Sequence, residues 1–389
     1  MEQASERPAG LPRAVWWASW TFVGLVGFSR VSFGLLLPFV KHDYPASYGV
    51  YGTVAAANFA GYLVALIALP LVPAAWQRRR ANTIAIGVIA LSLAASGLAP
   101  DLASLAVARF VNGLAQGVAT ILTIGLTLAL VEPAARGRAS GILWGGGGIG
   151  IALAGASIPI AASAPFAWRW VWLAMAVLVV FGMVGLHRAL PSRVSGNLAS
   201  DDARGNDVPA LVVLGAQYTL FGLAFGAYIS FAPAFAHALV SGAVALAIAW
   251  IITGASAALG SDLWGRALDR SPRGLTLALC LALGAVGTAL LLAAHLASDV
   301  VSAILFGSSS VGGPAQTSAL TRRYADGASY VRALSLITMV FAVGQTVGAL
   351  VGGRIADLAG LGATVTVSSL LFAAAALAAL LLLSRPRRT

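Results

Sequence analysis

Residues 209–234 read PALVVLGAQYTLFGLAFGAYISFAPA, a run without one charged side chain. A helix needs about 20 apolar residues to cross the ~30 Å hydrocarbon core of a bilayer, so this run is long enough to span one. The whole chain has the same character, since 59% of its 389 residues are hydrophobic, 10% are charged and the mean hydropathy is +0.89. A soluble domain typically carries about 25% charged residues. The sequence therefore predicts an all-α membrane protein.

Apolar runs of similar length recur on both sides of this segment, separated by short stretches with Arg, Pro and Asp. They predict twelve transmembrane helices, at residues 14–40, 48–70, 82–99, 102–131, 139–161, 168–190, 209–234, 241–263, 275–296, 300–321, 330–353 and 361–384. The longest polar gap divides these helices into two groups of six. We therefore expect an N-terminal six-helix bundle over residues 1–190, a cytoplasmic linker over 191–208 and a C-terminal six-helix bundle over 209–389.

The basic residues predict the orientation of the helices. With the N-terminus inside, the cytoplasmic segments hold all 24 Lys and Arg residues except Arg30, Lys41, Arg109, Arg169 and Arg354. Such an excess is typical of the cytoplasmic side of a membrane protein. We expect a multi-pass protein of the bacterial inner membrane with both termini cytoplasmic. The net charge of +11 fits this topology and does not indicate nucleic-acid binding.

The sequence gives no support to an enzymatic function. Lys41 is the single lysine and is followed by His42, so a Walker-type phosphate loop is excluded, and direct ATP hydrolysis with it. The four histidines lack metal-binding spacing, and the single Cys280 cannot form a thiol cluster. We expect neither catalysis nor a cofactor nor a metal site.

Glycine and arginine motifs carry a resemblance to a known superfamily. Residues 265–274 read GRALDRSPRG, which resembles the Gly-x-x-x-Asp-Arg loop of the major facilitator superfamily. The corresponding first-half segment, residues 73–80, reads PAAWQRRR and lacks the Asp. The resemblance implies two pseudo-symmetric bundles that work by alternating access. It also implies gating by Asp269 and Arg270, with Arg332 as a plausible partner at the start of the eleventh helix.

Three further patches resemble one bacterial branch of this superfamily, the YbfB/YjiJ branch. They are GFSRVSFGLLLP at residues 27–38, ANFAGYL at residues 57–63 and GQTVGALVGG at residues 344–353. In the fourth helix, Arg109, Gly113 and Gly117 resemble the superfamily's RxxxGxxxG pattern. The branch consists largely of transporters without an assigned substrate, so the resemblance implies a fold and a mechanism rather than a ligand.

Two arginines are predicted deep in the membrane. Arg30 lies about 16 Å along the helix before Lys41, and Arg109 lies about 12 Å after Asp101. A central arginine costs at least about 3 kcal/mol on insertion scales, and such residues usually mark a cavity or pathway. Every acidic residue maps to a terminus, a loop or a helix end, so no acid is expected at the depth of the two arginines.

The resemblance places both arginines on helices that line the central cavity. Polar residues at similar depth complete the candidate substrate site, although such side chains often only bridge neighbouring helices. The predicted binding residues are Arg30, Arg109, Asn58, Tyr62, Asn112, Gln116, Gln217, Tyr218, Ser309 and Gln345.

Two guanidinium groups without an acidic partner are complementary to a carboxylate, sulfonate or phosphate. The sequence thus predicts a secondary transporter of a small organic anion, working by anion exchange or by proton-linked symport, in contact with membrane lipid and functional as a monomer. One alternative is an efflux carrier for drugs or metabolites, which normally needs a buried acid. Another is a membrane sensor that binds the ligand without transporting it.

Overall fold

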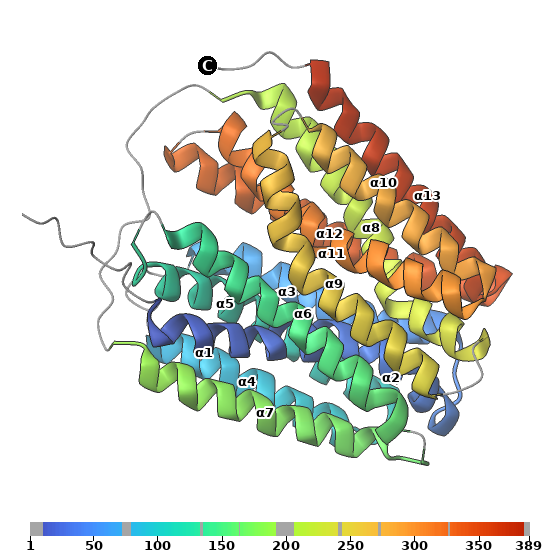
Figure 1. The fold of residues 1–389 in the computed structure, drawn as a ribbon. Coiled ribbons are helices and arrows are strands. Elements are labelled where there is room, and N and C mark those ends of the chain that lie inside the picture. The colour runs from blue at the N-terminus through green and yellow to red at the C-terminus, as the bar shows by residue number, and fades with distance from the viewer. Residues whose placement is uncertain are drawn as a thin grey trace, which may run out of the picture.

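The computed structural model describes residues 11–71, 79–132, 135–162, 164–191, 206–239, 243–270, 274–325 and 327–384. Within these residues the fold is helical throughout (Figure 1). Twelve helices are long and apolar enough to cross a membrane, which confirms the predicted number.

The first half of the chain contains six of these spans. The first span consists of three consecutive segments, α1 (Arg13–Phe22), the π-helical η1 (Val23–Val31) and α2 (Ser32–Asp43). The others are α3 (Tyr48–Ala68, followed by the 3₁₀ turn Leu69–Leu71), α4 (Arg79–Leu98), α5 (Leu102–Leu128), α6 (Arg136–Ala161) and α7 (Trp168–Ala189). The observed bounds lie within a few residues of the predicted ones.

The second half contains the remaining six spans. They are α8 (Val208–Leu239), α9 (Ala243–Arg270), α10 (Leu275–Leu290, followed by the 3₁₀ turn Leu291–Ala293), α11 (Leu296–Tyr324), α12 (Gly327–Ala359) and α13 (Leu361–Leu380, followed by the 3₁₀ turn Leu381–Ser384). Within this half α8 packs against α12 and α13, while α11 packs against α9 and α10. In the first half α5 packs against α3 and α4, and α6 against α1 and η1.

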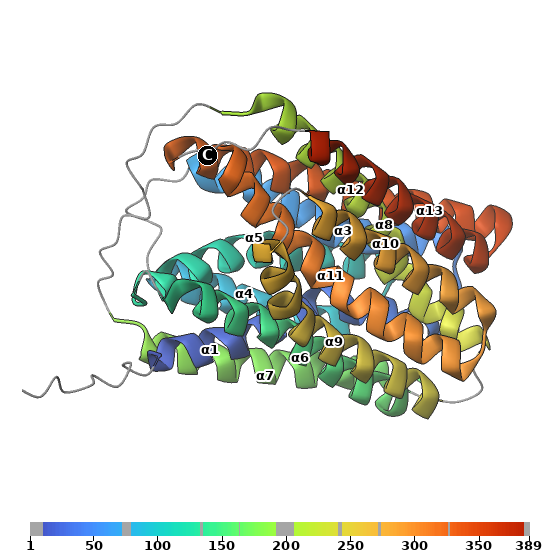
Figure 2. The ribbon, with the colours of Figure 1, turned by 45° about the horizontal axis from the view of Figure 1, so that its top comes forward.

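Most contacts between the two halves are made by α6 with α9, α3 with α12 and α2 with α8. The first pair crosses so closely that a Cβ atom at Gly148 of α6 would lie 2.5 Å from the backbone nitrogen of Ala258 in α9. Glycine is required here because helices in lipid associate through close backbone packing. Figures 1 and 2 show that the two halves diverge toward the ends at which α1 and α8 begin.

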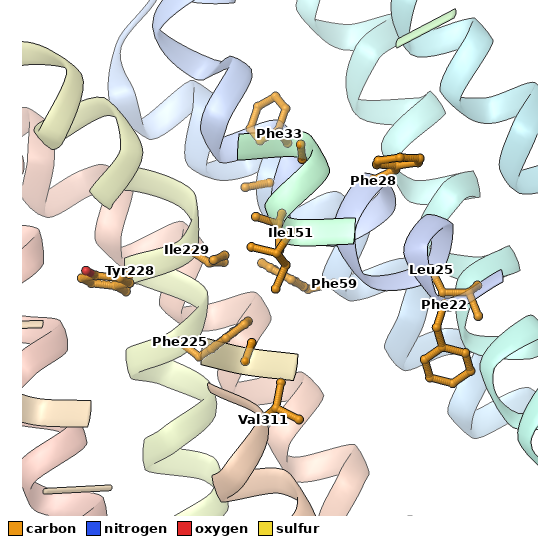
Figure 3. Packing of buried hydrophobic residues seen from close by; sticks show 14 of the residues in the cluster. Phe22, Leu25, Phe28, Phe33, Phe59, Ile151, Phe225, Tyr228, Ile229 and Val311 are labelled. Atoms are coloured by element: carbon orange, nitrogen blue, oxygen red, sulfur yellow. The ribbon is translucent and has the colours of Figure 1, made fainter. Parts of the chain in front are cut away.

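Buried apolar side chains fill the space between the helices. Phe33 and Phe59 of the first half and Phe225 and Ile229 of the second half belong to one continuous cluster (Figure 3). Phe33, Phe59 and Ile229 of this cluster also line the cavity that contains Arg30 and Arg109.

Candidate functional site

Arg30 lies near the end of the π-helical segment η1 and is partly buried. A π-helix inside an α-helix is rare and is frequently found at functional sites. The guanidinium of Arg30 lies over the ring of Tyr62, 4.7 Å from its centroid, and its Nε has no hydrogen-bond partner. A cation held by an aromatic face keeps its N–H groups free for another acceptor.

Arg109 lies in α5 and is 1% exposed. Its Nη2 donates to the backbone carbonyl of Ser29 in η1, and its guanidinium lies 4.9 Å from the ring centroid of Trp172 in α7. Nε and Nη1 have no hydrogen-bond partner. Arg109 is therefore fixed on one side by the first half of the chain and keeps unpaired donors on the other.

The two arginines line one cavity. Asn58 of α3 shares this cavity, and α8 closes it from the second half; the full lining is Arg30, Phe33, Gly34, Ala55, Asn58, Phe59, Arg109, Ile229 and Ser230. None of these residues is acidic. Among the described residues neither arginine forms an ion pair. The cavity is thus positively charged and lies between the two halves.

Asn58 and Asn112 connect helices around the cavity. The Asn58 side-chain amide donates to the carbonyl of Arg109 at 3.1 Å and to Asn112 Oδ1 at 3.0 Å, and Asn112 in turn donates to Ser92 Oγ at 2.9 Å. Asn58 Oδ1 remains without a partner. Asn112 of α5 therefore bonds to both α3 and α4, and of the two asparagines only Asn58 lines the cavity.

Gln116 does not line the cavity, and its side chain binds the backbone of a neighbouring segment instead. Its Nε2 donates to the carbonyl of Leu25 in η1. Since Arg109 binds the carbonyl of Ser29, two side chains from α5 bind two carbonyls of the same π-helical segment. The polar face of α5 thereby holds η1 in place.

Tyr62 of α3 and Tyr218 of α8 lie near Arg30, where the two halves meet. Tyr62 packs with Leu66 and with Ala342 of α12. Tyr218 of α8 stacks on Phe341, with ring centroids 4.3 Å apart and an interplanar angle of 10°. Tyr218 is also close enough to Arg30 to interact with it electrostatically.

The structure does not bring Gln217, Ser309 or Gln345 to the lining of this cavity. Gln217 donates to Thr317 Oγ1 at 2.9 Å, inside the second half. Ser309 faces α10, where a Cβ at Gly284 would meet it. Gln345 is fully buried in α12, and both polar atoms of its amide lack a partner. The role of all ten residues in binding a substrate stays a prediction.

The predicted gate stays untested. The side chains of Asp269 and Arg270 lie outside the described part of the structure, and Arg332 is exposed.

A contact between the halves that the sequence analysis missed lies at the start of α3. The carboxylate of Asp357, at the end of α12, accepts hydrogen bonds from the backbone N–H groups of Tyr48 at 2.6 Å and Gly49 at 2.8 Å. A carboxylate at a helix N-terminus binds unpaired N–H groups and is favoured by the helix dipole. Lys41 lies over the Tyr48 ring, 4.7 Å from its centroid. In the sequence, Asp357 is visible only as an acid shortly after a glycine-rich helix. That pattern does not indicate which residues the carboxylate binds.

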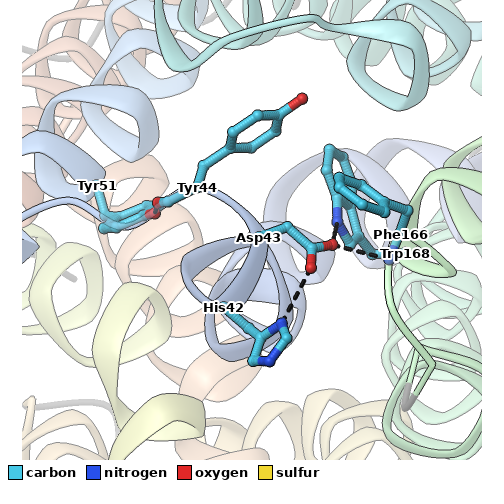
Figure 4. A network of polar contacts seen from close by, with 6 residues as sticks. All are labelled: His42, Asp43, Tyr44, Tyr51, Phe166 and Trp168. Carbon is cyan, nitrogen blue, oxygen red and sulfur yellow. Dashed lines mark hydrogen bonds and ion pairs between the residues drawn. The ribbon is translucent and has the colours of Figure 1, made fainter.

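A second carboxylate organises the same end of the first half (Figure 4). Asp43 accepts from the backbone N–H of Phe166 at 2.8 Å and from Trp168 Nε1 at 2.7 Å, and it pairs with His42 at 3.0 Å. Phe166 has a positive φ of 56°, which is uncommon for a residue with a side chain. Asp43 therefore fixes the turn into α7, while Asp357 joins the two halves at the end that contains residues 43–48.

Two six-helix halves around a charged, centrally placed cavity define a multi-pass membrane transporter of the major facilitator fold. Residues 21–384 match the family model described as "Uncharacterised MFS-type transporter YbfB", and the chain belongs to this family. The predicted superfamily and branch are thus confirmed.

Solved transporter structures share the fold at low sequence identity. A D-xylose–proton symporter is 15% identical, with 96% of this chain and 98% of that chain covered and a TM-score of 0.77. A bacterial homologue of the human lysosomal transporter Spinster, inward-facing and occupied, is 16% identical, with 95% and 96% covered and a TM-score of 0.73. A human organic anion transporter is 15% identical, with 95% and 100% covered and a TM-score of 0.66.

Proposed function

We propose that this transporter carries a small organic anion of carboxylate or sulfonate type across the bacterial inner membrane by alternating access. The observation that carries the proposal is the convergence of Arg30 and Arg109 on one cavity whose lining has no acid. Guanidinium groups bind such oxyanions through charge-assisted, often bidentate hydrogen bonds. In a largely dry cavity these bonds are stronger than in water.

The two arginines have different tasks in this proposal. Arg30, partly exposed and stacked on Tyr62, is the group that meets the incoming anion. Arg109 is held by the Ser29 carbonyl and Trp172, so it offers the anion a rigid second set of donors. Fixed donors lose little conformational entropy on binding.

The fold permits this substrate class without choosing it. One neighbour is an organic anion transporter, while others are a nucleoside transporter and a xylose symporter. The choice of an anion therefore depends on the charge of the cavity alone.

The position of the contacts between the halves favours an inward-facing state. Asp357 ties α12 to α3 at the end containing residues 43–48, and the halves diverge at the other end. With both termini cytoplasmic, the closed end faces the outside of the cell.

Equilibrium binding to the purified protein tests the proposal. A panel of mono- and dicarboxylates, sulfonates and phosphate esters is expected to contain at least one ligand that binds saturably. Replacing Arg30 with Gln should weaken this ligand about 10- to 100-fold, because a charged hydrogen bond contributes about 1.5–3 kcal/mol.

Arg138→Gln is the matched control, since Arg138 is an exposed arginine on α6. The affinity of this variant for the anion should equal that of the wild type. Equal affinity of the wild type and Arg30→Gln, or binding of cations and neutral compounds only, would contradict an anion site at Arg30.

A further inference from the structure

Helix α8 separates two cavities. Ile229 and Ser230 line the cavity of the arginine pair, while Tyr228 lines a second cavity. Tyr228 and Ile229 point to different sides of α8 (Figure 3). The second cavity lies among α8, α9 and α11 and is lined by Tyr228, Ala232, Ala236, Ala245, Leu246, Ala249, Trp250, Thr253, Leu291, Asp299, Ser302, Ala303 and Phe306.

Asp299 is the single charged residue of this lining. It lies in the first turn of α11, is 5% exposed, and its Oδ1 has no hydrogen-bond partner. Among the described residues it forms no ion pair. It interacts electrostatically with His295, which directly precedes α11, and with Tyr228 of α8. Burial of an unpaired carboxylate is costly, so this side chain needs a compensating group.

A helix-dipole role does not account for Asp299. An acid in the first turn of a helix is stabilised by the dipole whether or not it is buried. Asp101 shows this at the start of α5, where it is exposed and accepts from the Ser104 backbone N–H at 2.7 Å. Asp299 makes no such cap and lines a cavity instead. Asp299 lies at a helix end, as expected for every acidic residue, but its side chain is buried there.

The walls around Asp299 are aromatic. Tyr228 of α8, Trp250 of α9 and Phe306 of α11 all line the cavity, and the rings of Tyr228 and Phe306 have centroids 4.3 Å apart. Aromatic faces attract cations, and aromatic cages recognise quaternary ammonium groups. Besides the carboxylate, the lining offers only the hydroxyls of Tyr228, Ser302 and Thr253.

We propose that the cavity formed by Asp299, Tyr228, Trp250 and Phe306 binds a small organic ammonium group. The ammonium group pairs with Asp299 Oδ1, and its alkyl substituents contact the aromatic rings and the alanines. This chemistry is offered both by a free amine and by the headgroup of a lipid such as phosphatidylethanolamine. The site shares no lining residue with the arginine cavity, so this proposal does not depend on the anion proposal.

Binding of radiolabelled choline to the purified protein in detergent tests this site. We expect saturable binding that tetramethylammonium and ethanolamine displace. Asp299→Asn should weaken choline binding at least tenfold, and Trp250→Leu should weaken it too. Asp101→Asn and Arg30→Gln should bind choline like the wild type. Thermal unfolding of each variant identifies any that fail to fold, and Tyr228→Leu provides a further wall variant.

The source of the ammonium group is found by repeating the assay in nanodiscs. If a lipid headgroup occupies the site, phosphatidylethanolamine discs will reduce choline binding relative to phosphatidylglycerol discs. Equal binding in the two discs will assign the site to a free amine. Absence of saturable binding by all three amines, or wild-type affinity in folded Asp299→Asn, would overturn the proposal. So would displacement of choline by Na⁺ at equal concentration.

Discussion

Arg30 and Arg109 share a cavity but differ in what their removal leaves behind. Arg109 is fully buried, and its Nη2 satisfies the carbonyl of Ser29. Arg30 is partly exposed, and its aromatic partner Tyr62 has no unmet bond when the guanidinium is removed. The two residues should therefore be separable by stability, even if both bind the anion.

We predict that Arg109→Leu lowers thermal stability while Arg30→Leu does not. Loss of one partner from a buried hydrogen bond costs about 1–3 kcal/mol because the other partner stays unpaired. Thermal unfolding of the purified variants in the same detergent measures this difference. Arg109→Lys is the informative companion, since a lysine can still donate to Ser29 but lacks the planar fork. Equal melting temperatures for Arg30→Leu and Arg109→Leu would show that the Ser29 bond does not stabilise the fold.

The sequence predicted the depth of both arginines but not their partners. The predicted depth follows from counting residues along a helix, and the structure places Arg30 and Arg109 at one cavity. The partner of Arg109 is a backbone carbonyl, which every residue has and no sequence pattern marks. Ser309 illustrates the same limit, because neighbouring helix positions differ by about 100° in direction and small errors turn a side chain to another face.

At the scale of elements, the contact of Asp357 with the start of α3 joins the halves. We predict that Asp357→Asn weakens this contact. The N–H groups of Tyr48 and Gly49 bind different carboxylate oxygens, and an amide keeps only one acceptor and loses the negative charge that favours the helix N-terminus. The population with this end open should rise. Spin labels at Val50 of α3 and Leu358 of α12, both exposed, would report it as longer distances.

Asp101→Asn is the control for this measurement. Asp101 is an exposed acid that caps its own helix through Ser104, whose backbone N–H holds the pKa of Asp101 below its usual value. Its substitution should leave the Val50–Leu358 distances unchanged. If Asp357→Asn gives the wild-type distribution as well, the carboxylate does not hold the two halves together.

The crossing of α6 and α9 gives a further prediction. A Cβ at Gly148 would meet the backbone of α9, whereas a Cβ at Gly145 of the same helix meets nothing within 4 Å. Gly148→Ala should therefore reduce transport strongly by forcing the halves apart, while Gly145→Ala should transport normally. Uptake into liposomes with matched protein content measures both. Similar rates for the two variants would mean that this crossing tolerates separation.

The helix boundaries were predictable because apolar runs between polar residues report the bilayer directly. The π-helical segment η1 was not, since its extra residue per turn leaves no mark on composition. Gln116 and Arg109 from α5 bind carbonyls in η1, so the segment depends on contacts between helices that are distant in sequence. The same holds for Asp357, whose partner lies in the other half of the chain.

At the scale of the whole molecule, the charge of the cavity bears on energy coupling. Two guanidinium groups line it without an acid, so an empty cavity that closes in both halves would carry uncompensated positive charge inside the membrane. That state is costly. A carrier with a bound anion avoids most of this cost, which favours a return step with a substrate in place.

We therefore expect exchange of one anion for another rather than proton-linked symport. Radiolabelled uptake into liposomes, with and without unlabelled internal anion, is measured at symmetric pH and with the outside acidic. Exchange predicts that internal anion accelerates uptake several-fold and that the pH gradient has little effect, because no proton need accompany the anion. Protein-free liposomes and Arg30→Gln liposomes give the background. Uptake that ignores internal anion, rises with the imposed gradient and changes the internal pH in step would instead establish proton coupling. In that case the anion travels inward together with a proton, and the empty carrier returns despite the positive charge of its cavity.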